Sequence, residues 1–151
     1  MSDEAFMAGF RSGPLASFRL MKLVHPHMIR RGGGMIFNFT SSVGIRWDKA
    51  NYGCYGAIKQ GTRALTRAAA SEWGGENIRV LTIAPHAETL ALKQWIDQNP
   101  GEAEGFFNTI PLGHIGRPQE DIGRASAALC KQDLNYLTDA TIPLDGGQAN
   151  F

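Results

Sequence analysis

The sequence predicts an α/β fold in which a three-stranded parallel sheet is flanked by helices. Three short segments have the apolar character of buried strands, and helical patterns separate each of them from the next. Strands that alternate with helices run parallel, because each crossover returns the chain to the same end of the sheet. No repeat, low-complexity tract or linker interrupts this order, so we expect residues 1–151 to form a single unit.

The first predicted element is an amphipathic helix over residues 14–30. Apolar side chains recur there at three- and four-residue spacing. Ser12-Gly13-Pro14 predicts its start, with Pro14 in the first turn, and Gly32-Gly33-Gly34 predicts its end. Pro26 lies inside the pattern and should kink the helix near its end. Residues 1–11 are compatible with an earlier helical segment.

The remaining elements follow from the same signals. Residues 35–40, 78–84 and 140–144 are predicted strands, the second stopped by Pro85 and the third followed by the turn Asp145-Gly146-Gly147. Helices are predicted over residues 52–73, over 89–108 with a break at Asn99-Pro100-Gly101, and over 118–130. Residues 41–51 form the loop between the first strand and the long helix.

Composition excludes several classes of protein. Apolar residues make up 43% and charged residues 19%, which is typical of a soluble globular domain. The net charge of +1 gives no reason to expect a nucleic-acid partner or an anionic membrane. No apolar run approaches the ~20 residues that span a bilayer, and charged residues at the N-terminus argue against a signal peptide. Two cysteines are expected to be reduced thiols of a cytoplasmic protein.

The chemistry concentrates between the first strand and the long helix. Tyr55 and Lys59 are four residues apart on a predicted helix, so their side chains share one face. A neighbouring ammonium favours the tyrosinate form by Coulomb attraction. Ser42 follows the first strand, at the end of the sheet where α/β folds place ligands, and could hold a substrate oxygen between itself and Tyr55. The ordinary alternative is an exposed lysine beside an aromatic ring.

Several blocks in order resemble the short-chain dehydrogenase/reductase (SDR) family. Ser42 precedes Tyr55 by thirteen positions, the family's common interval, and the Tyr-x-x-x-Lys pattern follows. The other matching blocks are Asn38-Phe39-Thr40-Ser41-Ser42, Asn77 to Pro85, Ile110 to Pro118, and Leu144-Asp145-Gly146-Gly147. The resemblance covers nearly the whole chain from about Pro14 onward and implies a partial Rossmann-like, doubly wound sheet.

The resemblance also implies roles for individual residues. Tyr55 would be the acid/base, Lys59 would also bind the nicotinamide ribose, and Ser42 would orient the substrate carbonyl. The segment after the second strand would contact the nicotinamide amide, which gives Pro85, His86, Glu88 and Thr89 as further cofactor-binding candidates beside Tyr55 and Lys59. The implied cofactor is NAD or NADP, and the implied substrate is a small carbonyl compound or alcohol.

Four departures from the family pattern bear on activity. The glycine-rich turn from strand into helix that holds the dinucleotide is absent, because Gly32-Gly33-Gly34 runs from helix into strand. The selector of NAD against NADP is absent with it. Gly13 stands where many members have a catalytic asparagine. His86 and Asp139 replace usual glycines. His86 is either a local titrating group or a tolerated loop residue, and the second interpretation is favoured because no partner carboxylate is evident in the sequence. Asp139 is interpreted as a turn residue that accepts a left-handed backbone.

Other chemistry-bearing residues give no site. His25 and His27 are two apart on a helix and point to different faces, so no metal pair is expected. Cys54 beside Tyr55 is interpreted as a packing residue, and Asp145 as a turn residue.

Two functions remain open from the sequence. The first is an SDR-type oxidoreductase that transfers hydride between NAD(P)(H) and a ketone or alcohol, with Tyr55 as acid/base, in a chain that holds the catalytic half of the fold. The alternative is a non-catalytic remnant that acts as a dimerising or ligand-binding module. In both cases we expect a homo-oligomer formed through helices 14–30 and 52–73, whose apolar faces exceed what three strands can cover.

Overall fold

The computed structural model of the protein describes residues 1–44 and 53–149. Its centre is a parallel sheet with strand order β1-β2-β3, which confirms the predicted fold class. The strands are β1 (Gly34–Phe39), β2 (Ile78–Pro85) and β3 (Thr141–Leu144). The helices are α1 (Asp3–Phe10), α2 (Ala16–Arg30), α3 (Gly53–Trp73), α4 (Leu90–Gln98), α5 (Pro100–Phe107) and α6 (Arg124–Leu129).

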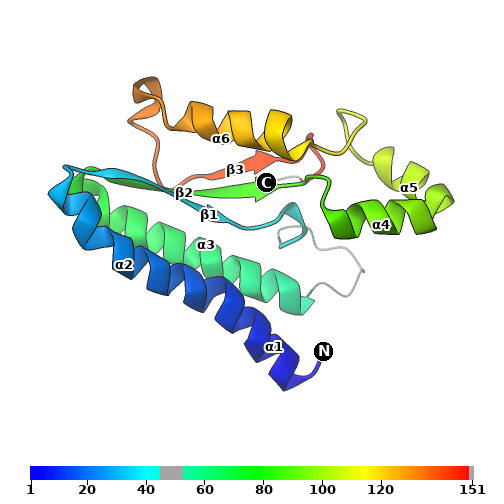
Figure 1. Ribbon diagram of the computed structural model, residues 1–151, viewed down its shortest axis with the longest axis horizontal. Coiled ribbons are helices and arrows are strands. Elements are labelled where there is room, and N and C mark those ends of the chain that lie inside the picture. Colours follow the sequence, from blue (N-terminus) through cyan, green and yellow to red (C-terminus); the bar gives the residue numbers. More distant parts are fainter. Residues whose placement is uncertain (45–52, 150–151) are drawn as a thin grey trace.

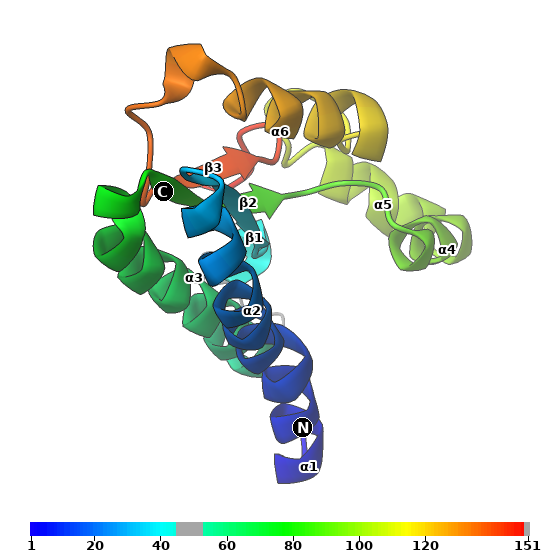
Figure 2. The same cartoon turned by 60° about the vertical axis from the view of Figure 1, so that its left-hand side comes forward.

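The helices lie on both faces of the sheet and beyond one of its ends. The helices α2 and α3 lie along one face, and α6 lies along the other (Figure 1). The helices α4 and α5 stand beyond the carboxyl ends of the strands, and α1 projects away from the sheet (Figure 2). The carboxyl ends of β1 and β2 therefore lie together at one end of the sheet, between α3 and the α4–α5 segment.

The core is centred on β2, the middle strand. Ile78, Val80, Leu81, Ile83 and Ala84 of this strand are fully buried. A near-continuous apolar run is typical of a parallel strand that is covered on both faces. Met21 of α2 and Ala69 and Ala70 of α3 pack against Ile78 and Val80, with Ile36 of β1 at the margin.

The predicted helix start at Pro14 is wrong. The helix begins at Asp3, with Ser2 as its N-cap, and continues to Arg30 through a π-helical turn over Arg11–Leu15. Pro14 lies inside that turn and is buried. The wider π-helical turn accommodates the proline ring and its missing N–H, so the helix is not interrupted. The chain also continues as helix through Pro26.

Other boundaries agree with the sequence. The break within residues 89–108 falls at Asn99, between α4 and α5, and Asp139 has the left-handed φ of 59° that its turn position predicts. The helix predicted over 118–130 is divided into a π-helical turn (Pro118–Gly123) and α6. The first residue of the predicted 52–73 helix and most of the 41–51 loop lie outside the described residues.

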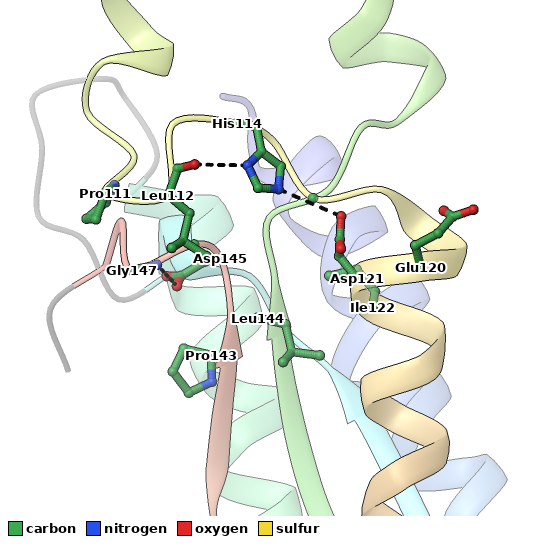
Figure 3. Close-up of a pocket in the computed structure, with 12 residues that line it drawn as sticks. Pro111, Leu112, His114, Glu120, Asp121, Ile122, Pro143, Leu144, Asp145 and Gly147 are labelled. Atoms are coloured by element: carbon green, nitrogen blue, oxygen red, sulfur yellow. Dashed lines mark hydrogen bonds and ion pairs between the residues drawn. The ribbon is translucent and has the colours of Figure 1, made fainter.

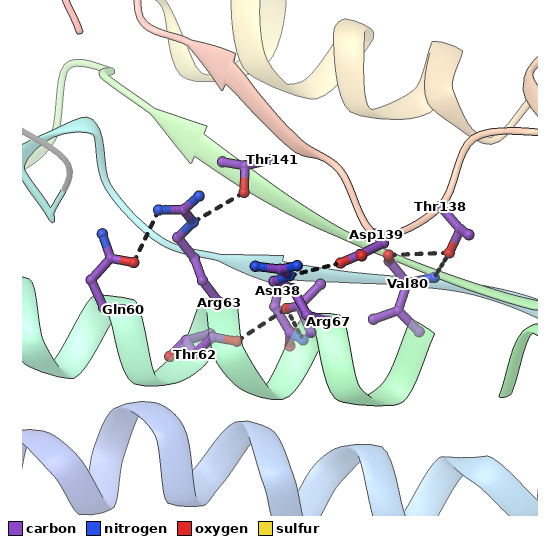
Figure 4. Close-up of polar contacts among 10 residues, drawn as sticks. Asn38, Gln60, Thr62, Arg63, Arg67, Val80, Thr138, Asp139 and Thr141 are labelled. Carbon is purple, nitrogen blue, oxygen red and sulfur yellow. Dashed lines mark hydrogen bonds and ion pairs between the residues drawn. The ribbon is translucent and has the colours of Figure 1, made fainter. Parts of the chain in front are cut away.

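Polar side chains tie α3 to strands on both sides of β2 (Figure 4). The Asn38 Nδ2 of β1 donates to Thr66 Oγ1 at 2.9 Å, and both side chains are buried. The Arg63 Nε of the same helix donates to Thr141 Oγ1 of β3 at 3.1 Å, and Arg67 pairs with Asp139 at 3.6 Å. These contacts fix the position of α3 relative to the whole sheet.

Candidate active site

The candidate site lies where the chain leaves β1 and meets α3. After β1 the chain enters a short 3₁₀ turn, Ser42–Gly44, that contains the predicted serine. Gln60 Nε2 donates to the Gly44 carbonyl at 2.8 Å, and Thr40 Oγ1 donates to the Lys59 carbonyl at 3.3 Å. The Ser42 turn is therefore anchored to α3 at two places that bracket the turn.

Gly44 allows this close approach. A Cβ atom placed on Gly44 would lie 3.0 Å from the Lys59 Cβ, closer than side-chain packing normally permits. A larger residue would push the Ser42 turn away from α3. The glycine therefore lets the Ser42–Gly44 turn lie against α3 at Lys59.

Ser42 is buried without a hydrogen-bond partner in the described part of the chain. Its side chain is 1% exposed, and Oγ contacts no donor or acceptor there. Buried hydroxyl groups are nearly always paired, and those that are not commonly mark a site where a ligand or water completes the bonding. The unpaired Ser42 hydroxyl is thus a candidate hydrogen-bond donor to a bound oxygen atom.

Tyr55 and Lys59 share one face of α3, as their spacing predicts. The Lys59 Nζ lies 5.4 Å from the centroid of the Tyr55 ring, within cation–π range. Tyr55 is 38% exposed, so its ring is accessible from solvent. The helix therefore places the Lys59 ammonium over the face of the Tyr55 ring.

The segment after β2 reaches the same edge of the sheet, but two of its side chains have structural roles. Thr89 is the N-cap of α4, and its Oγ1 accepts the Leu92 N–H at 3.2 Å. Glu88 pairs with Lys93 at 3.8 Å, and its backbone N–H donates to the Gly116 carbonyl at 2.9 Å. A threonine at the start of the helix predicted over 89–108 was the available signal for the cap, whereas no sequence pattern indicated the Glu88–Lys93 pair.

His86 links β2 to the segments on either side of it. Its backbone N–H donates to the Leu144 carbonyl of β3, and its carbonyl accepts from the Gly116 N–H. Its ring packs edge-to-face against Phe106 of α5, with centroids 5.3 Å apart, and Phe106 packs in turn against Trp95 of α4. A histidine in place of glycine therefore connects the α4–α5 segment to the end of the sheet.

Gly13, which stands where family members often have asparagine, packs directly on α3. A Cβ there would lie 2.9 Å from the Ile58 Cγ2. An asparagine side chain could not enter this position without moving Ile58, so the departure from the pattern is built into the helix packing.

A pocket of about 750 Å³ lies at the carboxyl end of β3 (Figure 3). His114 contacts the Leu112 carbonyl at 2.9 Å through Nδ1 and approaches Asp121 at 3.9 Å through Nε2. The Arg117 side chain and backbone N–H donate to Asp121 and hold the pKa of that carboxyl well below its usual range. The Asp145 carboxylate accepts from the Gly147 and Ala149 N–H groups, which confirms it as a turn residue. Ser42, Tyr55 and Lys59 do not line this pocket.

Sequence analysis missed the Arg117–Asp121 pair. The four-residue spacing beside Pro118 was the available signal, because it is typical of the first turn of a helix. His25 and His27 behave as their spacing predicts: His25 stacks on Trp73 and pairs with Glu76, while His27 contacts Arg30.

The described residues hold neither a metal-binding cluster nor a membrane-spanning helix. Within residues 1–44 and 53–149, no group of three or more His, Cys, Asp and Glu side chains could hold a metal ion. Over the same ranges, no helix has both the length and the apolar character needed to cross a bilayer.

The chain is similar to known proteins over nearly its whole length. The family model described as enoyl-(acyl carrier protein) reductase matches residues 1–149. The chain is 34% identical to the 12alpha-hydroxysteroid dehydrogenase of Clostridium sp., over 97% of its own length and 56% of that protein. It is 32% identical to the 3-oxoacyl-(acyl-carrier-protein) reductase of Thermotoga maritima, over 97% and 58% of the two chains.

The fold is also similar to that of a solved structure of a dehydrogenase. A 7 alpha-hydroxysteroid dehydrogenase, solved with NADH and 7-oxo glycochenodeoxycholic acid, superimposes with a TM-score of 0.88 at 31% identity. The match covers 99% of this chain and 57% of that one. The chain thus spans little more than half the length of these relatives. The extent of the family match and the shared fold show that the chain belongs to the short-chain dehydrogenase/reductase family.

Proposed function

We propose that this chain carries the proton-transfer centre of an NAD(P)-dependent oxidoreductase that acts on a small ketone or the corresponding alcohol. In the reducing direction, Ser42 Oγ donates a hydrogen bond to the substrate oxygen and Tyr55 gives its phenolic proton to that oxygen. Lys59 stabilises the resulting tyrosinate. The cofactor, when bound, supplies the hydride that the substrate carbon accepts.

The observation that carries this proposal is the buried Ser42 hydroxyl. It has no partner in the described residues, and its turn packs on the α3 segment that presents Tyr55 and Lys59. A hydroxyl that served only to pack the fold would normally be satisfied by a backbone group. The names of the relatives, which are dehydrogenases and reductases, support the same class of reaction.

The residues present fit one end of a nicotinamide dinucleotide. Lys59 and Tyr55, with the segment after β2, would hold the reacting end. A diphosphate group needs a glycine-rich turn from strand into helix. The described turn between β2 and α4, residues 86–89, contains no glycine, and Gly44 after β1 packs on Lys59. The described residues therefore offer no diphosphate cradle.

The test is carbonyl reduction by purified protein with NADH and NADPH, over a panel of ketones. Replacing Tyr55 with Phe removes the transferable proton and should lower kcat by about 10²–10⁴-fold. Tyr136→Phe is the matched control, because Tyr136 is fully exposed and should leave kcat unchanged. Equal rates for Tyr55→Phe and the unchanged protein would refute the role of Tyr55.

A measurement of cofactor binding distinguishes the enzyme from the alternative, a non-catalytic module. A fluorescence titration with NADH or NADPH that shows no saturable binding up to millimolar concentration would exclude catalysis by the chain on its own. The two free cysteines, Cys54 and Cys130, support a reducing, cytoplasmic setting for either function.

We further propose that two copies associate through helices 14–30 and 52–73. A groove of about 370 Å³ runs between these helices, and its lining is almost entirely apolar: Phe10, Pro14, Leu15, Phe18, Gly61, Ala64 and Leu65. A two-fold axis would bury this face against itself. Phe18→Glu should shift the sedimentation of the protein to that of a monomer, whereas Leu90→Glu on α4 should not.

A further inference from the structure

The Ser42–Gly44 turn depends on its neighbours for its position. It is a 3₁₀ turn of three residues, in which the Gly44 N–H donates to the Ser41 carbonyl at 3.0 Å. Short 3₁₀ turns have poor hydrogen-bond geometry and are weak by themselves. The β1 side of the turn is tied to the sheet, because the Thr40 N–H donates to the Ile83 carbonyl at 2.8 Å. The placement of the turn therefore depends on what holds its Gly44 side.

The Gln60 side chain of α3 holds the Gly44 side of the turn. Its Nε2 donates to the Gly44 carbonyl at 2.8 Å, and its Oε1 accepts from Arg63 Nη1 at 2.9 Å. A backbone carbonyl only accepts and a guanidinium only donates, so the side chain between them must donate at one end and accept at the other. A neutral amide meets both demands. The two partners also fix which end of the Gln60 amide faces the turn.

Arg63 extends this contact to the last strand of the sheet. Its Nε donates to Thr141 Oγ1 of β3 at 3.1 Å, while its Nη1 donates to Gln60 (Figure 4). The guanidinium is planar and rigid, so it fixes two acceptors relative to each other. Gln60 and Arg63 are both half-buried, where a hydrogen bond is electrostatically stronger than in water. Three consecutive hydrogen bonds thus join β3 to the turn that carries Ser42.

Arg67, one helical turn further along α3, gives an internal comparison. It also reaches the β3 side of the sheet, where it pairs with Asp139 at 3.6 Å, but its side chain is 74% exposed. Asp139 precedes β3, whereas the Ser42 turn lies at the carboxyl end of β1. Exposed ion pairs contribute little to stability. The two arginines therefore differ: both join α3 to the β3 side, but the hydrogen bonds of Arg63 continue to the turn.

We propose that Gln60 and Arg63 are positioning residues for Ser42 and hold its hydroxyl where the substrate oxygen binds. The catalytic consequence rests on the proposed function, whereas the hold on the turn does not. Ser42 is 1% exposed and packed on α3, so a movement of the turn changes the direction in which Oγ points. A displacement of about 1 Å in a positioned group can lower a rate by about 10²-fold. The contacts from β3 thus set the geometry of the candidate site from outside it.

The test combines amide hydrogen exchange at Gly44, measured by NMR, with the kinetics of carbonyl reduction. Gln60→Met keeps the length of the side chain but removes both of its hydrogen bonds. We expect Gly44 exchange to become about 2–10-fold faster and kcat to fall by roughly 10–100-fold, with a smaller change in KM. Gln60→Glu keeps the Arg63 contact but not the donor to Gly44, so it should not restore either value. Arg63→Leu should act in the same direction, and Arg67→Leu is the matched control that should change neither.

A double-mutant cycle with Ser42→Ala distinguishes positioning from a general structural role. Because Gln60 acts through Ser42, Gln60→Met should change kcat by less than about twofold in the Ser42→Ala protein. Faster Gly44 exchange in Gln60→Met, in a chain whose unchanged form shows no turnover, would support the hold on the turn and refute the proposed function. Unchanged Gly44 exchange, equal losses of kcat in both backgrounds, or an effect of Arg67→Leu as large as that of Arg63→Leu would overturn the proposal.

Discussion

The two outer strands of the sheet, β1 and β3, differ in how each ends it. The Ala140 and Leu144 carbonyls accept bonds from β2, so the backbone of Thr141 and Pro143 faces outward. Pro143 has no N–H, and it occupies one of the two outward positions of a four-residue strand. The β1 edge instead presents Met35, Phe37 and Phe39 on a six-residue strand without proline or charge. Of the two edges, only the β3 edge carries a proline that opposes further pairing.

This contrast relates the fold to the proposed chemistry. The carboxyl ends of both outer strands lie at the same end of the sheet. Ser42 follows β1 there, and the pocket that contains His114 and Asp121 lies at the end of β3. In doubly wound sheets the ligand lies at the carboxyl edge where strand order reverses. The candidate residues Ser42, Tyr55 and Lys59 therefore lie at the carboxyl end of β1, on the side of the sheet away from the β3 pocket.

The largest expected effect on stability comes from placing proline at an inward position of β1, compared with placing it at an outward position. Ile36 faces β2 with its backbone, so Ile36→Pro breaks the β1–β2 ladder and removes an apolar side chain from the core margin. It should lower the free energy of unfolding by about 3 kcal/mol or more. Phe37→Pro alters an outward position and should cost about 1 kcal/mol. Urea denaturation of the two variants measures the difference, and equal losses would contradict the assigned alternation.

A smaller effect on stability is expected at the hydrogen bond that joins β1 to α3. Thr66→Val keeps the side-chain shape but removes the acceptor that Asn38 Nδ2 uses at 2.9 Å. A buried amide that loses its partner costs about 1–3 kcal/mol. Thermal unfolding compares this variant with Thr109→Val, whose hydroxyl is exposed. A loss no larger than that of the control would mean that Asn38 finds another partner.

The β3 edge should become competent for pairing when its proline is removed. Pro143→Thr restores an outward N–H, and its direct effect on stability should be below about 0.5 kcal/mol because the position is exposed. Phe37→Pro is introduced in the same protein so that the β1 edge stays closed. We then expect concentration-dependent association in sedimentation velocity that Phe37→Pro alone lacks. Unchanged sedimentation would show that the length of β3, rather than Pro143, ends the sheet.

The sequence predicted most of the fold because its signals were local. The strand β2 is apolar throughout and is bounded by Asn77 and Pro85, so its limits were readable. The helix start predicted at Pro14 was wrong because proline marks a helix start only where the residues before it are not already helical. Here Gly9 and Gly13 allow close packing on Ile58, and tertiary contact maintains the helix through the proline.

For the candidate site, the sequence predicted the relation between residues on one helix but not the packing between elements. The spacing of Tyr55 and Lys59 sets their common face, because an α-helix alone determines that relation. The burial of Ser42 was not predictable, because it depends on how the turn at Gly44 packs on Gln60, sixteen residues later. The capping role of Thr89 depends likewise on where α4 begins.

The smallest effect concerns acid stability at the β3 end. The Arg117 side chain and backbone hold the pKa of Asp121 below its unfolded value of about 3.9. A lowered folded-state pKa stabilises the fold above the unfolded pKa, and this contribution is lost as the pH falls below about 4. Asp121→Asn should therefore reduce stability at pH 7 and flatten the loss between pH 7 and pH 3, with Asp97→Asn on α4 as the exposed control. The effect should be small because the pair is solvent-exposed, and an unchanged acid slope would show that the β3 end is held by the Asp145 turn instead.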